Sequence, residues 1–270
     1  MTNLDGSYLN GALISTPEKQ AIASAFGRAA PSYDQHAQFQ RDVVDKLLQR
    51  LPISLIGKRI LDVGCGTGYL TEKLIQRGAT VVALDLSDKM LEQARLRCGE
   101  LATYYLGDAE ALPFDDDSFD YVVSSLALQW CDDLSVPIRD MKRVCKVGGH
   151  VLFSTLAEGS LDELKQAWSY VDQYQHVREF VTKKAIKIAL AQSNCDGSQV
   201  DLAKMTYWYR SAFELMKDLK GIGATQIGGR SHGLTKKSSL VKVEQVYQKL
   251  FQTNLKLPAT YQVCLGLIKK

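Results

Sequence analysis

The chain has 270 residues, which is long for one domain and short for two complete ones. Hydrophobic residues make up 46% and charged residues 23%, the balance of an ordinary globular protein, so disordered, collagen-like and coiled-coil classes are excluded. The 33 basic and 30 acidic side chains leave a net charge of +3, too small a bias to indicate general nucleic-acid binding. No apolar run approaches the roughly 18 residues that a membrane span needs.

The N-terminal segment MTNLDGSYLNGALIS has neither a basic stretch nor a sustained apolar one, so we expect no signal peptide. The 6 cysteines lie far apart, with no CxxC pair and no histidine at metal-ligand spacing. We interpret them as reduced packing residues, and we expect no metal site and a cytoplasmic location.

Helices are predicted first in the chain. Residues 1–15 are expected to form a loose leader. Ser15 or Thr16, followed by Pro17 and Glu18, is a helix-start signal, because a hydroxyl caps the helix and proline is tolerated in its first turn. Residues 17–51 then predict helices that are broken at Pro31.

From Lys58 onward, short apolar runs alternate with helical segments of about ten residues, which predicts parallel βαβ units. The expected strands are 59–63, 80–85, 103–108, 119–125 and 149–155, and the expected helices are 71–78, 88–98 and 134–146. Further on we expect a helix over 159–174, a strand near 203–209, a helix near 211–221 and a final strand over 260–270. The expected organisation is a leader with lid helices (1–51) and a second domain (52–270) that has a helical insertion at about 157–200.

The most informative segment of the sequence, ILDVGCGTGY, contains three glycines. An apolar strand runs into three alternate glycines, Gly64, Gly66 and Gly68, and a helix follows. Glycine permits a tight turn there and lets a ligand approach the backbone without interference from a Cβ atom. The spacing GxGxG differs from the dinucleotide fingerprint GxGxxG, and no Lys-Ser/Thr pair follows as in a P-loop.

Three acids lie at the ends of predicted strands. Asp62 precedes the glycines, where an anion repels phosphates and favours a cationic ligand such as a sulfonium. Asp85 ends the next strand and can accept both hydroxyls of a ribose, and Asp108 ends the third and can accept from an adenine amino group. Each acid can instead cap a following helix, but open α/β sheets bind ligands at the carboxyl ends of their strands.

Four segments (DVGCGTG, ALDLS, GDAEALPF and VGGHVLF) together resemble the S-adenosylmethionine-dependent class I methyltransferases. The resemblance implies an α/β, Rossmann-like fold with a mostly parallel seven-stranded sheet, helices on both faces and a reversed last strand. It also implies S-adenosylmethionine as methyl donor. The residues expected to bind it are Asp62, Gly64, Cys65, Gly66, Gly68, Asp85, Leu86, Asp108, Ala109 and Leu126.

Other segments resemble one family in that superfamily, the malonyl-[acyl-carrier protein] O-methyltransferases of biotin synthesis. They are AFGRAAPSYDQHAQFQR, SSLALQWCDDL, TLAEGSLDELKQAW and LKGIGATQI. The resemblance implies methyl transfer to the free carboxyl of a malonyl thioester, carried by acyl-carrier protein or by coenzyme A. It implies neither nucleic acid nor a membrane as a partner.

Methylating a carboxylate needs no general base, because the acceptor is already ionised at neutral pH. The acceptor must still be held, and a bidentate arginine suits it, so we expect Arg28 or Arg178 ahead of Arg230. The candidate acceptor-binding residues are Arg28, Tyr33, His36, Gln129, Trp130 and Arg178. Packing is the competing interpretation for each of them. Arg28 and Tyr33 lie in N-terminal helices, which in this superfamily often fold over the cofactor as a lid.

The acyl-carrier protein implied by the resemblance is acidic, so a basic surface is expected. Two groups of basic residues at helical spacing are candidates for the surface that binds the carrier protein. The first is Arg139, Lys142, Arg143 and Lys146, and the second is Lys183, Lys184 and Lys187. Ordinary solvated surface is the competing interpretation of both.

Other activities remain open. One is a C- or O-methyltransferase acting on a quinone-like small molecule; C-methylation would need a base, for which the sequence offers His36, His150, His176 and His232. A nucleic-acid amine methyltransferase is disfavoured, because the segment 124–127 reads SSLA in place of an Asn/Asp-Pro-Pro-aromatic box. A cofactor-binding scaffold without activity is disfavoured by the intact glycines and the acid at Asp85.

Overall fold

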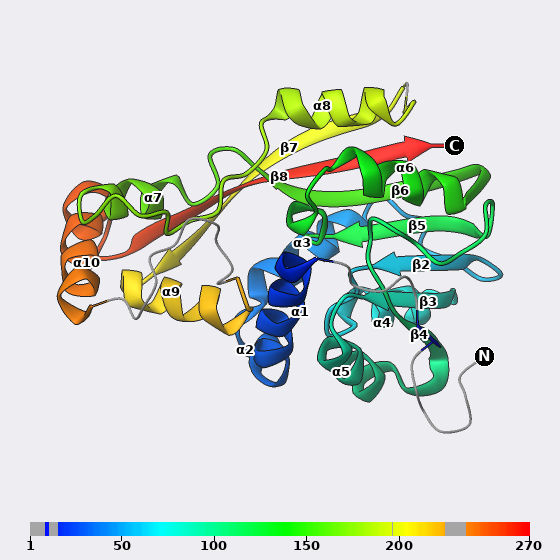
Figure 1. Ribbon diagram of the computed structural model, residues 1–270, viewed down its shortest axis with the longest axis horizontal. Helices are drawn as coiled ribbons and strands as arrows, with labels where there is room; N and C mark the ends of the chain where they lie inside the picture. Colours follow the sequence, from blue (N-terminus) through cyan, green and yellow to red (C-terminus); the bar gives the residue numbers. More distant parts are fainter. Residues whose placement is uncertain (1–8, 11–15, 196, 225–235) are drawn as a thin grey trace.

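One mixed sheet runs through the protein (Figure 1). The computed structural model describes residues 9–10, 16–195, 197–224 and 236–270, and within them the strand order is β1-β4-β3-β2-β5-β6-β8-β7. Strands β1 to β6 pair in parallel, whereas β8 is antiparallel to both β6 and β7. The strands are β1 (Leu9–Asn10), β2 (Arg59–Val63), β3 (Thr80–Asp85), β4 (Ala102–Leu106), β5 (Phe119–Ser125), β6 (Cys145–Ala157), β7 (Gln199–Tyr209) and β8 (Leu257–Lys269).

The predicted seven-stranded, Rossmann-like sheet with a reversed last strand is confirmed by β2 to β8. The two-residue β1 pairs with β4 at the edge and adds one short strand, so the expected leader contributes to the sheet.

Helices cover both faces of the sheet. The strands alternate their side chains between two cores: Ile60 and Val81 belong to one, and Leu61 and Val82 to the other. The first core is closed by α3, α4 and α5 and continues under α7, α9 and α10, while the second is closed by α6 and α8. The helices are α1 (Pro17–Ala29), α2 (Tyr33–His36), α3 (Gln38–Leu48), α4 (Tyr69–Gln76), α5 (Asp88–Cys98), α6 (Ser135–Val144), α7 (Asp162–Ser169), α8 (Lys183–Gln192), α9 (Ala212–Gly221) and α10 (Lys237–Phe251).

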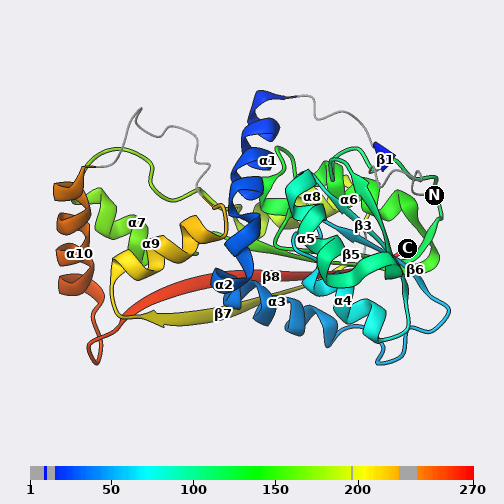
Figure 2. The ribbon, with the colours of Figure 1, turned by 90° about the horizontal axis from the view of Figure 1, so that it is seen from below.

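The N-terminal helices begin and break where the sequence predicts. The Thr16 side chain accepts a hydrogen bond from the backbone N–H of Lys19, 3.3 Å away, and caps α1. A 3-10 turn over Ala30–Ser32, which contains Pro31, separates α1 from α2. Figures 1 and 2 both show α1 and α2 standing between α5 on one side and α9 on the other.

A wing extends from the sheet on one side (Figure 1). Strands β7 and β8 run beyond the other strands, and α7, α9 and α10 pack around their far ends. Here the predictions were least complete: the expected helix over 159–174 ends at Ser169, β7 begins at Gln199 rather than near 203, and α10 was not predicted. The expected insertion at 157–200 contains α7 and α8.

None of the 6 cysteines, all of which lie in the described residues, forms a disulfide, and all except Cys131 are buried. The packing role predicted for them is therefore supported by their positions, while the cytoplasmic location stays a prediction. Among the described helices, none combines the length and the apolar character that crossing a bilayer requires.

Candidate active site

Three adjoining cavities open at the carboxyl ends of the parallel strands. The first, here the strand-end cleft, lies where β2, β3, β4 and β5 end and leaves about 690 Å³ of empty space, a size typical of small-molecule sites. The second, the glycine-loop cavity, lies between the loop after β2 and helices α2 and α3. The third, the apolar cavity, is enclosed by α1 to α3, the 176–180 segment, the end of α9, and β8. Tyr33 lines all three, so they meet at this residue.

The glycine loop follows β2 with positive φ at all three glycines, as the GxGxG spacing predicts. At Gly66 (φ +55°) a Cβ atom would meet nothing within 4 Å, because this glycine faces open space in both the strand-end cleft and the glycine-loop cavity. At Gly64 a Cβ atom would lie 2.3 Å from the Cβ of Ala127. The loop thus packs closely on one side and exposes backbone to a ligand on the other.

Asp85 ends β3 at the floor of the strand-end cleft and is only 9% exposed. Its carboxylate accepts hydrogen bonds from the backbone N–H groups of Gly66 (2.8 Å) and Ser87 (2.9 Å). Burial raises its pKa to about 6, although these bonds act in the opposite direction. A buried carboxylate that faces a cleft and uses only part of its hydrogen-bonding capacity is a suitable acceptor for the two hydroxyls of a ribose.

Asp62 lies on β2, is 1% exposed, and lines the glycine-loop cavity together with Cys65. One of its oxygens accepts the Thr71 hydroxyl at 2.7 Å. Burial raises the pKa of Asp62 to about 7, and no described lysine, arginine or histidine forms an ion pair with it. A positively charged group of a ligand in this cavity would restore its ionised form.

Asp108 follows β4 and lies with Leu86 and Ala109 on the wall of the strand-end cleft. Its carboxylate is not free, because Lys19 of α1 donates to it at 2.5 Å and also pairs with Glu110. Lys19 is 5% exposed, so this ion-paired cluster is buried. The cluster fastens α1 to the rim of the cleft, a contact that the sequence did not predict.

The apolar cavity contains most of the predicted acceptor-binding residues. Tyr33, Gln129, Trp130 and Arg178 line it, and Trp130 and Leu126 also line the strand-end cleft. The Arg178 guanidinium lies over the Trp130 ring, 5.1 Å from its centroid, and forms no ion pair with any described residue. The Gln129 side chain is already used, since it donates to the Leu126 carbonyl at 2.6 Å.

Three predicted residues lie elsewhere. Arg28 is exposed on α1 and lines none of the cavities. His36 pairs with Asp218 of α9 at 2.7 Å and is likewise outside the cavity walls. Gly68 is also outside them, and a Cβ atom there would lie 3.0 Å from Ala94, so this glycine permits close packing of the loop on α5. The expected alternative Arg230 lies outside the described residues.

Phe26 was missed by the sequence reasoning, and His176 entered it only as a candidate base for C-methylation. Phe26 packs edge-on to Trp130, with ring centroids 5.2 Å apart, and separates the apolar cavity from the strand-end cleft. His176 lines the apolar cavity, stacks on Trp168 and pairs with Asp172 at 2.8 Å. These residues are scattered singly along the chain, and only their three-dimensional contacts reveal them.

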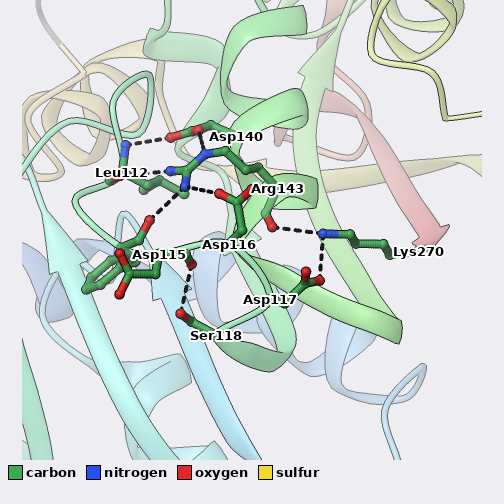
Figure 3. A network of polar contacts seen from close by, with 9 residues as sticks. Leu112, Asp115, Asp116, Asp117, Ser118, Asp140, Arg143 and Lys270 are labelled. Carbon is green, nitrogen blue, oxygen red and sulfur yellow. Dashed lines mark hydrogen bonds and ion pairs between the residues drawn. The ribbon is translucent and has the colours of Figure 1, made fainter.

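The first predicted group of basic residues does not lie on one helix. Helix α6 ends at Val144, so Lys146 lies in β6 and not on the helix. Figure 3 shows Arg143 at the centre of an internal network, where it pairs with Asp140 (2.6 Å) and Asp116 (2.8 Å) and donates to the carbonyls of residues 112 and 114. This arginine holds the loop before β5 against α6. In the second group, Lys183, Lys184 and Lys187 are all exposed on α8.

Residues 61–153 match the family model described as a methyltransferase domain. The malonyl-[acyl-carrier protein] O-methyltransferase of Erwinia pyrifoliae is 42% identical over 94% of this chain and 95% of its own length. The biotin biosynthesis bifunctional protein BioHC of Cellvibrio japonicus is 39% identical over 93% of this chain and 50% of its own length.

The fold also has solved counterparts. A phosphoethanolamine N-methyltransferase 2 of Haemonchus contortus, solved with S-adenosylhomocysteine, is 19% identical and has a TM-score of 0.60 over 94% of this chain and 60% of its own. At this identity the likeness shows the class I methyltransferase fold alone. The close relatives show more, and the chain belongs to the malonyl-[acyl-carrier protein] O-methyltransferase family.

Proposed function

We propose that this protein transfers a methyl group from S-adenosylmethionine to the free carboxylate of malonyl-[acyl-carrier protein], forming the methyl ester at an early step of biotin synthesis. The proposal rests on family membership and on the site. The single observation that carries it is the apolar cavity: among its described lining residues only Arg178 bears a permanent positive charge, and that charge is unpaired. A buried anion without a partner costs several kcal/mol, so such a cavity selects an acceptor that ends in a carboxylate.

The strand-end cleft and the glycine-loop cavity fit the methyl donor. In our proposal Asp85 accepts the ribose hydroxyls, Leu86 and Ala109 contact the adenine ring, and Asp108 lies at its amino edge. The exposed backbone at Gly66 lets the donor approach, with Gly64 and Leu126 forming the adjoining wall. Asp62 and Cys65 line the end that takes the amino-acid part.

Bound S-adenosylmethionine supplies an electrophilic methyl group on a positively charged sulfur. The protein then has to align the acceptor oxygen with that methyl group, which is worth several kcal/mol in effective-molarity terms. Arg178 holds the carboxylate while Phe26, Tyr33 and Trp130 exclude water at the junction of the two cavities. Because a cation and an anion become two neutral groups, a dry junction favours the reaction. No general base is required, since the acceptor is ionised.

We propose further that the helices of the described residues 16–51 (α1 to α3) provide a lid over the domain formed by 52–270. Two groups of polar contacts support a closed position. Lys19 of α1 pairs with Asp108 and Glu110. Asp34 of α2 accepts a hydrogen bond from Thr67 at 2.7 Å and pairs with Arg97.

We also propose that the carrier protein docks at Lys183, Lys184 and Lys187, which are exposed at the start of α8, shortly after Arg178. Coenzyme A as the thioester carrier, in place of the protein, remains a second possibility for the same cavity.

One observation favours a different acceptor. His176 pairs with Asp172 in the wall of the apolar cavity, an arrangement that can orient a base. C-methylation of a quinone-like ring would use such a base. Arg178, however, would have no role with a neutral ring.

One assay separates these activities. The protein is incubated with methyl-labelled S-adenosylmethionine and, in parallel, with malonyl-[acyl-carrier protein], malonyl-coenzyme A, acetyl-[acyl-carrier protein] and a quinol. We expect label in the malonyl thioesters and none in the acetyl thioester or the quinol, with alkaline release of methanol identifying the ester. Label in the quinol alone would contradict the proposal.

A further inference from the structure

Gln40 of α3 is an unusual residue at the place where the cavities meet. It lines both the apolar cavity and the glycine-loop cavity. Its side-chain oxygen, Oε1, is buried and has no hydrogen-bond partner among the described residues. Buried polar atoms are paired in the great majority of cases, so an unpaired acceptor in a cavity wall indicates a ligand that donates to it.

The surroundings define the chemistry of that donor. Asp62, a buried carboxylate that lines the glycine-loop cavity, has one oxygen bonded to Thr71, and no ion pair joins it to a described cation. The nearby cation Arg41 already donates to the Asp34 carbonyl at 2.7 Å and to Gln38 at 2.8 Å. The cavity therefore offers a neutral oxygen and a carboxylate to one ligand group, which suits a group with several N–H donors and a positive charge. A carboxylate ligand does not suit it, because it would place acceptor against acceptor.

Within the proposed function, on which this inference rests, one ligand group has that character. We propose that Gln40 is a cofactor-binding residue whose side-chain oxygen accepts a hydrogen bond from the primary ammonium of S-adenosylmethionine, alongside Asp62. Since Gln40 also lines the apolar cavity, it fixes the amino-acid end of the donor next to the acceptor. It is distinct from Arg178, which faces the malonyl carboxylate.

Two ligands test this inference without any turnover. S-adenosylhomocysteine carries the ammonium, whereas 5′-methylthioadenosine shares the adenosine and the sulfur but lacks the amino-acid part. We expect Gln40→Leu to weaken S-adenosylhomocysteine binding roughly tenfold to a hundredfold in calorimetry, as the loss of one hydrogen bond to a charged group would. Binding of 5′-methylthioadenosine is expected to stay within about twofold, the range of small surface effects.

Three control measurements accompany the leucine variant. Gln40→Glu keeps an acceptor oxygen and adds a negative charge, so it should bind S-adenosylhomocysteine at least as tightly as the wild type. Gln49→Leu, at an exposed position just after the same helix, should change the affinity for neither ligand. The thermal midpoint of Gln40→Leu should not fall, because leucine removes an unsatisfied buried polar atom.

The possible results are distinct. Equal weakening of both ligands by Gln40→Leu, or a loss with Gln40→Glu as large as with leucine, would overturn the assignment to the ammonium. Unchanged S-adenosylhomocysteine binding in Gln40→Leu would overturn it as well. Failure of the wild-type protein to bind S-adenosylhomocysteine would instead contradict the proposed function.

Discussion

The strand-end cleft and the apolar cavity share a wall but are built in different ways. The cleft takes its polar groups from the ends of neighbouring parallel strands, at Asp85 and Asp108 and in the loop after β2, all within about fifty residues of chain. The apolar cavity is assembled from side chains as distant in sequence as Phe26, Arg178 and Tyr261. Backbone geometry defines the first site and tertiary packing of side chains the second.

The two regions also differ in charge. Asp62, Asp85 and Asp108 make the donor side acidic, whereas the acceptor side is apolar with a cation at Arg178. This division matches a cationic donor and an anionic acceptor. It also means that damage to one region should leave ligand binding in the other region nearly intact.

The largest effect is expected from Gly66→Val. The valine side chain would occupy the open space where the donor approaches the backbone, so affinity for S-adenosylhomocysteine should fall beyond detection in calorimetry. Gly99→Val is the control: Gly99 has nearly the same φ (+57° against +55°), its Cβ would also meet nothing within 4 Å, and it lines none of the three described cavities. Both variants should lose stability from backbone strain, because both glycines have a positive φ. Tight binding by Gly66→Val would show that the loop is not a ligand site.

A smaller effect is expected from Asp85→Asn. At pH 8 the loss of charge-assisted bonds, about 1.5–3 kcal/mol, should weaken binding of 5′-methylthioadenosine roughly tenfold to a hundredfold. The pKa of Asp85 is raised to about 6, so the wild-type carboxylate takes up a proton as the pH falls through 6 and its affinity for the ribose should decline there. Calorimetry from pH 5 to 8 measures this slope. Asp85→Asn should be flat over that range, and a flat wild-type profile would refute the ribose assignment.

The smallest effect on affinity is expected from Lys19→Met, which tests how α1 is held at the rim of the strand-end cleft. Methionine keeps the packing volume but leaves Asp108 and Glu110 without their cation, so α1 should detach more often. Hydrogen exchange of the α1 amides should accelerate about tenfold or more, while the amides of α4 stay protected. Donor affinity should change only severalfold. Uniform acceleration throughout the chain would mean that the cluster supports the whole fold and not the lid.

The contrast between the regions also explains what the sequence can reveal. Alternating apolar runs and a glycine loop specify local backbone geometry, so β2 to β6 were predicted within a few residues of their observed bounds and Asp62 and Asp85 in their observed strands, whereas Asp108 lies two residues beyond the end of β4. The acceptor side depends on tertiary contacts: Arg28 and Arg178 have the same chemistry, but only the latter reaches the cavity. His36 pairs with Asp218 of α9 and does not line the cavity. No sequence motif marks helix α10.

The central claim is that the strand-end cleft binds the methyl donor and the apolar cavity binds the acceptor. Arg178→Leu tests it most directly, with Arg28→Leu as the matched exposed control. Both are assayed for kcat/KM with malonyl-[acyl-carrier protein] and for calorimetric affinity for S-adenosylhomocysteine. Loss of a charge-assisted bidentate contact, worth about 3 kcal/mol or more, should lower kcat/KM by roughly a hundredfold in Arg178→Leu and leave its donor affinity within about twofold of wild type. Arg28→Leu should match the wild type in both measurements. Near-normal kcat/KM in Arg178→Leu, or parallel loss of donor affinity, would contradict the account.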